Sequence, residues 1–255
     1  MDILTCVKRV PETGEKIVLT DDRKAVADLG LGNTVSPHEE CAVEEALQQT
    51  EAHGGTTTVL TLGPDEATEQ LTTAVARGAD EPVLLEAETT DPGPAAVAGA
   101  ITSYIQDRGD GEVPFDVLLF GNESADAGNY QVPVRVAREL GLPVITGIKK
   151  LDLEDGTATA KREVAGGWEV YELDLPAVIT VKEGINHPRY ASMRGRMQAR
   201  KTPVETVEAA VDPDERFELI ELEVPAVDDR EAETLGEGEA AAARVVDVLE
   251  ELEVL

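Results

Sequence analysis

Residues 116–121 read Asp-Val-Leu-Leu-Phe-Gly, with four consecutive apolar side chains between a charged residue and a glycine. Side chains of a strand alternate between the two faces of its sheet, so an unbroken apolar run predicts burial on both faces. Strands of this kind are typical of parallel sheets that are covered by helices on both sides. The run therefore indicates a helix-covered parallel sheet.

Similar runs alternate with helical patterns on both sides of this segment. Further strands are predicted at residues 2–7, 57–62, 82–85, 143–145 and 176–181. Helices are predicted over about residues 37–53, 65–77, 94–107 and 134–140, the first of them behind a Ser36 N-cap with Pro37 at its first position. This alternation predicts an α/β fold with an open, mostly parallel, doubly wound sheet and a ligand crevice at the carboxyl ends of its strands.

The pattern changes after about residue 149. Residues 150–155, 157–163 and 168–173 alternate polar and apolar side chains around the turns Asp155-Gly156 and Gly166-Gly167. They predict an antiparallel ribbon added to the sheet. Beyond residue 202 there are eighteen acidic and three basic residues, and the next helix is predicted over about 239–252. We expect a nucleotide-binding core over residues 1–205, with a recognition loop near 184–200, and an acidic C-terminal arm over 206–255.

The composition limits the possible functions. There are 52 acidic and 22 basic residues, which gives a formal charge of −30 and a pI near 4.3. Such a field repels nucleic acids and anionic lipids, so we expect neither nucleic-acid binding nor membrane insertion, and the acidity favours a halophilic source. Cys6 and Cys41 are the only cysteines and form no CxxC pair, which disfavours a disulfide framework or a thiolate metal site. With no signal peptide or long apolar segment, the chain is expected to be cytoplasmic.

Three junctions between a strand and the following loop are candidates for a binding site. They are Cys6–Arg9, Leu62-Gly63-Pro64 and Gly121–Gln131. In a parallel sheet they would converge at the end where the strands have their carboxyl termini. Glycines and helix N-termini suit a phosphate group, although the same residues also make ordinary turns. The common catalytic and metal-binding motifs are absent, so we predict no catalytic residue and no metal site.

A basic segment interrupts the acidic chain. Residues 182–201 include six basic residues and a single acidic one, Glu183. Pro188 prevents a continuous helix, and Tyr190 and Met193 are apolar side chains among charges. An apolar anchor ringed by charges is typical of a docking site, while local packing is the alternative.

These segments resemble a known family. Val7-Lys8-Arg9-Val10-Pro11, the segment from Ser36 to Ala46, the Gly121–Gln131 loop and Asn186-His187-Pro188-Arg189-Tyr190 are similar to the β subunits of electron-transfer flavoproteins. The resemblance implies a heterodimer with an α subunit that holds FAD at the interface. It also implies electron flow from acyl-CoA dehydrogenases or related flavoenzymes to a quinone oxidoreductase. The β subunit is then an electron-carrier subunit and not an enzyme, with a structural AMP and a C-terminal arm around the α subunit.

The resemblance also assigns site residues. The cofactor-binding positions are Cys6, Ser36, Leu62, Gly63, Asp126, Asn129, Tyr130, Gln131 and Val132. The partner-docking positions are Met193 as the apolar anchor, with Tyr190, Arg189, Arg194 and Arg196 beside it.

Two alternatives stay open. Val132-Pro133 stands where the family's AMP-binding loop has Thr-Gly, and the Gln-Val pair resembles electron-bifurcating members, whose β subunit holds a second FAD that accepts hydride from NADH. The alternative from another class is a stand-alone nucleotide-binding sensor on a similar fold.

Overall fold

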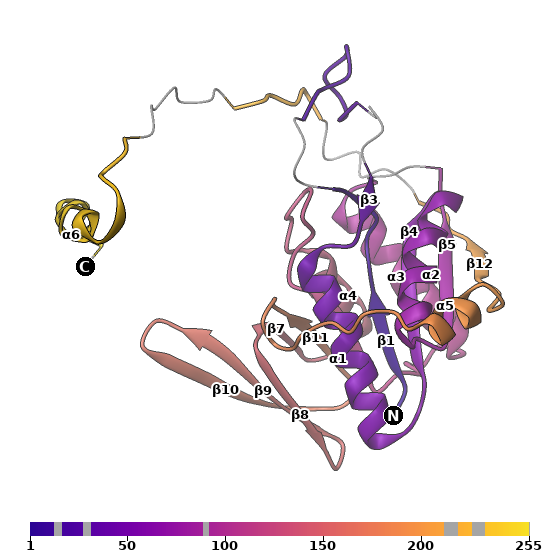
Figure 1. The fold of residues 1–255 in the computed structure, drawn as a ribbon. Coiled ribbons are helices and arrows are strands. Elements are labelled where there is room, and N and C mark those ends of the chain that lie inside the picture. Colours follow the sequence, from indigo (N-terminus) through magenta and orange to yellow (C-terminus); the bar gives the residue numbers. More distant parts are fainter. Residues whose placement is uncertain (13–16, 28–31, 89–91, 212–218, 226–232, 255) are drawn as a thin grey trace. The chain divides into compact units, whose positions relative to one another are not determined.

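The computed structural model describes residues 1–12, 17–27, 32–88, 92–211, 219–225 and 233–254 (Figure 1). Its central feature is a seven-stranded sheet in the order β12-β5-β4-β1-β6-β11-β7, in which every neighbouring pair is parallel. The strands are β1 (Ile3–Cys6), β4 (Thr57–Gly63), β5 (Glu81–Glu86), β6 (Val117–Gly121), β7 (Val144–Ile148), β11 (Ala177–Val181) and β12 (Glu205–Glu208). The parallel sheet predicted from residues 116–121 is confirmed.

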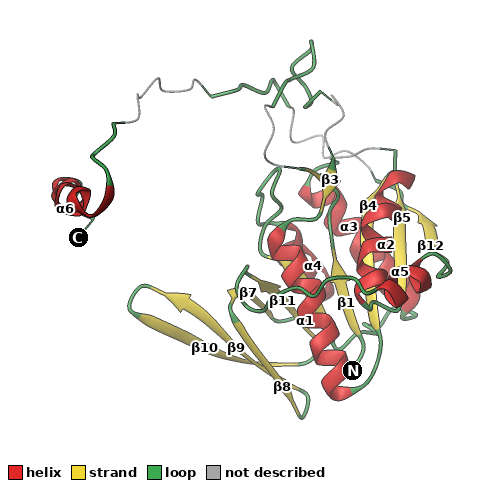
Figure 2. Cartoon of the chain, in the orientation of Figure 1, coloured by secondary structure: helices red, strands yellow, loops and turns green. Residues whose placement is uncertain are grey.

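Helices cover both faces of this sheet (Figure 2). They are α1 (Pro37–His53), the 3₁₀ turn η1 (Asp65–Ala67), α2 (Thr68–Arg77), α3 (Pro94–Arg108), α4 (Val132–Leu140) and α5 (Met193–Ala199). Ile3 and Val117 pack with α1 residues, while Leu4 and Leu118 pack with residues of α3 and α4. Successive residues of the central strands thus face opposite helical layers, as the unbroken apolar runs predicted.

The antiparallel strands β8 (Lys150–Glu154), β9 (Thr157–Val164) and β10 (Gly167–Asp174) form a separate three-stranded sheet. The predicted antiparallel ribbon is confirmed, and it forms a sheet of its own beside the central sheet. Leu153, Ala158 and Ala160 bury one face against the core, and Lys149 N–H donates to the Lys161 carbonyl oxygen at 2.9 Å. The ribbon is therefore attached mainly through side-chain packing.

Several short elements were not predicted. β2 (Val10–Pro11) pairs with β3 (Asn33–Thr34) in a two-stranded sheet, and α5 forms within the basic segment. β12 pairs with β5 at the edge of the central sheet, although its sequence Glu-Thr-Val-Glu has one apolar residue. Backbone pairing positions this strand, and hydrophobic patterning gives little sign of it.

The chain divides into two compact units, Met1–Lys16 with Asp28–Leu219 and Ile17–Ala27 with Ile220–Leu255. In the smaller unit, Leu222 N–H donates to the Arg23 carbonyl oxygen at 2.8 Å, and the Arg23 guanidinium lies 3.3 Å from Glu221. The predicted C-terminal helix forms as η2 (Gly238–Ala241) followed by α6 (Ala242–Glu251). Among the described residues, no helix is both long and apolar enough to cross a bilayer.

Candidate functional site

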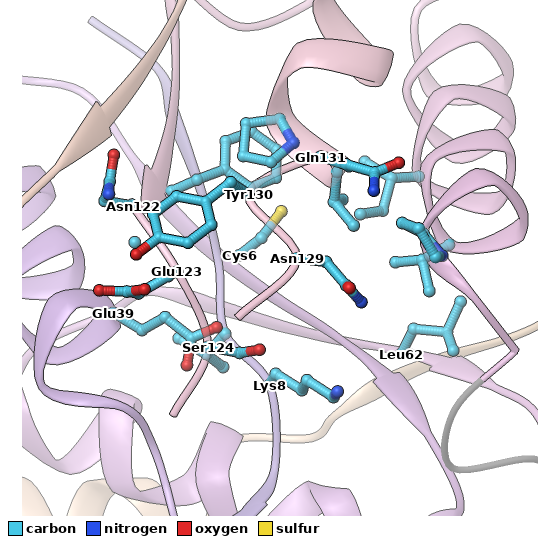
Figure 3. Close-up of a pocket in the computed structure, with 18 of the residues that line it drawn as sticks. Cys6, Lys8, Glu39, Leu62, Asn122, Glu123, Ser124, Asn129, Tyr130 and Gln131 are labelled. Carbon is cyan, nitrogen blue, oxygen red and sulfur yellow. The ribbon is translucent and has the colours of Figure 1, made fainter. Parts of the chain in front are cut away.

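A cleft of about 120 Å³ lies at the carboxyl ends of β1, β4 and β6 (Figure 3). Six of the predicted cofactor-binding residues line it: Cys6, Leu62, Asn129, Tyr130, Gln131 and Val132. The first residues of α3 and α4 also border it. The three strand-to-loop junctions therefore converge as the parallel topology predicted.

The other three predicted residues support the cleft from outside its lining. Ser36 is buried, and its Oγ accepts a hydrogen bond from Ala125 N–H at 2.8 Å, which fixes the 122–131 loop to the start of α1. Asp126 lies 2.6 Å from Lys8 Nζ. The Gly63 carbonyl oxygen accepts from Ala87 N–H at 3.0 Å, beside β5. Contacts of these three residues therefore hold the walls of the cleft in place.

Glu39 is a lining residue that the sequence interpretation missed. It is the third residue of α1, and its carboxylate completes a capping box by accepting from Ser36 N–H at 3.2 Å. Burial raises the pKa of Glu39 to about 8, against the opposing effect of hydrogen bonds from the Lys8 and Ser36 backbones. The sequence held one sign that Glu39 lines the cleft: it is an acid three residues after the N-cap. A side chain in the first turn of this helix lies beside the carboxyl ends of the strands.

Further lining residues include Lys8, Asn122 and Glu123, which lie within the predicted junctions, and Val97, Ile101 and Phe120, which were not predicted. Asn122 Oδ1 accepts from Thr180 Oγ1 at 2.9 Å, and Thr180 Oγ1 accepts from Gly147 N–H at 2.8 Å. This chain of hydrogen bonds fixes the start of the 122–131 loop to β11 and β7.

Cys6 and Tyr130 differ in their surroundings. Burial, with a smaller effect from Glu39, raises the pKa of the Cys6 thiol, so this residue stays a protonated, apolar part of the wall. Tyr130 has φ of 57°, which is uncommon for a residue with a bulky side chain. A hydrogen bond with Glu123 raises the pKa of its phenol. The strained backbone and this bond hold the ring at the rim of the cleft (Figure 3).

The α4 N-terminus gives the cleft its anion-binding chemistry. The first N–H groups of a helix have no intrahelical partner, and the helix dipole adds partial positive charge. Val132 is the first helical residue, and Pro133 supplies no N–H group. The Gln131 side chain is fixed because its Oε1 accepts from Arg135 Nη2 at 2.9 Å. Backbone donors of Val132 and Val134 are therefore the candidates for a phosphate.

The basic segment is fixed to α1 by hydrogen bonds and ion pairs that are partly buried or exposed. Arg189 donates from its backbone N–H and its Nε to Glu44 Oε2 at 3.0 and 2.9 Å, and its guanidinium also binds Glu51. Asn186 Nδ2 donates to Glu45 Oε2 at 2.9 Å. Burial would raise the pKa of Glu44, but hydrogen bonds from Arg189 and Gln48 hold it below its usual value. Arg189, predicted as a docking residue, is engaged within the chain.

The remaining docking residues are free of that network and exposed. Tyr190 is 97% exposed and Met193 76% exposed, and Arg194 and Arg196 are also exposed. α5 is capped by Ser192, whose Oγ accepts from Gly195 N–H at 2.9 Å. A Cβ on Gly195 would lie 2.1 Å from the Ala76 carbonyl oxygen, so α5 packs tightly on α2. The tightly packed α5 and the residues before it thus leave the side chains of Tyr190 and Met193 exposed.

Comparison with known proteins identifies the family. The family model of the electron transfer flavoprotein domain matches residues 24–212. The electron transfer flavoprotein subunit beta of Bacillus subtilis is 38% identical over 82% of this chain and 79% of its own length. The protein of the same name from Syntrophomonas wolfei is 38% identical over 88% of this chain and 86% of its own, and that from Bradyrhizobium diazoefficiens 32% identical over 98% and 95%. The chain therefore belongs to the electron transfer flavoprotein family, as a β subunit.

Proposed function

We propose that the cleft holds a structural AMP and that the exposed residues after Arg189 dock electron-donating flavoenzymes. Membership of the family as a β subunit gives the chain an α-subunit partner and a role in electron transfer rather than in catalysis. The observation that carries the proposal is the convergence of two helix N-termini on a cleft at the strand ends.

The residues of the cleft suit an adenine nucleotide. Leu62, Val97 and Ile101 give an apolar surface for a base, and the α4 N-terminus gives donors for a phosphate. Glu39 with a pKa of about 8 is mostly protonated at pH 7, which removes a negative charge that would repel the phosphate. Lys8, whose charge is shared with Asp126, lies on the same side. The donor set is therefore compatible with AMP.

In this function the AMP has a structural role. FAD, held with the α subunit, supplies the redox chemistry when bound. The β chain's own residues close the nucleotide cleft and dock the donor. We propose donors of the acyl-CoA dehydrogenase type and a quinone oxidoreductase as the acceptor. Met193 suits several donors, because its unbranched and polarizable side chain adapts to different pockets.

A second FAD in the cleft is the competing proposal, and it is favoured by the Gln131-Val132 pair, which resembles that of electron-bifurcating members. Val132-Pro133 also replaces the Thr-Gly of the family's AMP-binding loop, and this removes a hydroxyl group and a backbone N–H group that could bind the AMP phosphate. Such a β subunit would take part in electron bifurcation with NADH as the hydride source.

The test is to co-express the chain with its α subunit, denature the purified complex and quantify released flavin and adenine nucleotide. One FAD and one AMP per heterodimer is the expected result. Two FAD and no AMP would replace the carrier by the bifurcating function. A homodimer that does not co-purify with the α subunit would favour a nucleotide-binding sensor.

The C-terminal arm is proposed to bind the α subunit. α6 has no buried residue in the part of the chain that the structure describes, and Val245 and Val246 are exposed on it. A chain truncated after residue 210 should not co-purify with the α subunit, whereas the full chain should. Retention of the heterodimer after truncation would contradict this role.

A further inference from the structure

A second cavity, of about 130 Å³, adjoins the proposed nucleotide cleft and shares a lining residue with it. Val7 lines both cavities, and the neighbouring residues Glu39 and Glu40 of α1 line the first and the second respectively. The other walls come from β3 with Val35 and from α2. We refer to it as the polar cavity, because most of its lining side chains carry oxygen or nitrogen atoms.

Gln70 of α2 has an unsatisfied oxygen at this cavity. The residue lines the cavity and is 4% exposed. Its Nε2 donates to the Asn33 carbonyl oxygen at 3.5 Å, which sets the orientation of the amide. Its Oε1 is buried and has no hydrogen-bond partner among the residues that the structure describes. Leaving a buried acceptor without a partner costs folding free energy. A bound hydrogen-bond donor or a cation beside this oxygen would remove that cost.

The charges around the polar cavity favour a cation. Arg77 forms an ion pair with Glu40, so these two charges offset each other. Glu69 also lines the cavity and leaves its surroundings net negative. Thr34 and Thr73 add hydroxyl groups, and the Thr73 hydroxyl keeps acceptor capacity after donating to the Glu69 carbonyl oxygen at 3.0 Å.

The ligand set fits a singly charged ion better than a divalent one. No group of three or more His, Cys, Asp or Glu side chains that could hold a metal ion occurs among the described residues. Calcium sites use several carboxylates, whereas this cavity offers a neutral amide oxygen, hydroxyl groups and one carboxylate outside the ion pair. We propose that the polar cavity binds a monovalent cation of the potassium or ammonium type, with Gln70 Oε1 as a ligand.

Such an ion would connect three elements that meet at the polar cavity. Gln70 belongs to α2, Glu40 to α1, and Asn33 and Thr34 to β3. Binding to the folded chain alone stabilises it in proportion to the logarithm of ion concentration over Kd. The ion would therefore hold the β2–β3 pair against the helices, next to the wall that Val7 shares with the nucleotide cleft.

The experiment measures thermal unfolding of the complex with the α subunit in potassium, ammonium, sodium and choline chlorides at one ionic strength. Wild type should melt higher in potassium or ammonium than in choline, and the better of the two identifies the ion. In Gln70→Leu the ion concentration needed for the same rise in melting temperature should be at least about tenfold higher. Gln106→Leu, at an exposed position of α3, should respond as wild type does.

A direct measurement accompanies the unfolding series. Crystals of the complex soaked in thallium or rubidium chloride should give an anomalous peak at the Gln70 Oε1 atom. Equal melting in all four chlorides, or an unchanged ion response in Gln70→Leu, would overturn the proposal and leave an ordered water as the occupant. If Gln70→Leu does not fold, Gln70→Glu serves instead: it keeps an acceptor and adds a charge, so it should bind the ion more tightly. Unchanged affinity in that variant would also overturn the proposal.

Discussion

Helix α1 carries two buried glutamates whose pKa values are shifted in opposite directions. Glu39 lines the cleft at the strand ends, and burial raises its pKa to about 8. Glu44 is one turn further along, and Arg189 and Gln48 hold its pKa below the usual value despite its burial. The difference lies in the partners: Glu44 binds a guanidinium, whereas Glu39 is bound mainly by backbone donors. One helix thus provides a nearly neutral side chain at the cleft and an ionised anchor for the basic segment.

The largest expected effect comes from breaking the Glu44 anchor. Arg189→Ala leaves a carboxylate that is 4% exposed without its cation, which should lower the free energy of unfolding by about 4 kcal/mol. Denaturant unfolding of the complex measures this loss. Arg194→Ala removes an exposed arginine of the same segment and should cost about 0.5 kcal/mol or less. Equal losses in the two variants would show that the anchor adds nothing.

Glu39 should give stability the opposite response to pH from that of a paired acid. Its pKa is about 8 in the folded chain against an ordinary value of 4.5, so the folded chain keeps a proton that the unfolded chain releases. Its contribution to stability therefore falls as pH rises from about 4.5 to about 8 and is constant above. Glu39→Gln cannot titrate, so its stability relative to wild type should rise by on the order of 3 kcal/mol across that window.

Unfolding free energies at pH 5, 6.5 and 8.5, at constant salt, measure this difference. Glu66→Gln, at an exposed position, controls for the loss of one negative charge. A constant difference between Glu39→Gln and wild type at all three pH values would contradict the buried, protonated state.

The docking surface should respond to a change that leaves the Glu44 anchor intact. Met193→Asp places a charge at an anchor that is 76% exposed, and we expect a loss of about 2 kcal/mol of binding to the donor. That corresponds to about a 30-fold lower kcat/KM for reduction by the donor. Stopped-flow reduction of the α–β complex measures it, and Met193→Leu should retain most of the rate. Unchanged kinetics in Met193→Asp would remove Met193 from the docking surface.

The same comparison explains what sequence reasoning could predict. The parallel sheet and α1 follow from apolar runs and from a cap that acts locally, so they were predicted closely. The different environments of Glu39 and Glu44 were not predicted. Both residues belong to one helical pattern, and their environments depend on residues far along the chain. Arg189 lies 145 residues from Glu44, and only the fold brings the two together. Strand β12 was missed for a similar reason, since its pairing with β5 is a long-range backbone contact.

The smallest expected effect concerns the start of α1, the helix that carries both glutamates. Ser36 is the N-cap, and its Oγ also accepts from Ala125 N–H at 2.8 Å. Ser36→Ala should lower the free energy of unfolding by about 1 kcal/mol, because a cap and a contact to the cleft loop are lost together. Ser192→Ala removes the cap of α5, which has no such second contact to the cleft, and provides the matched control. If Ser36 supports the cleft as well as the helix, only its variant should release the bound nucleotide faster, as measured by dilution of the loaded complex. Equal release from both variants would restrict Ser36 to helix capping.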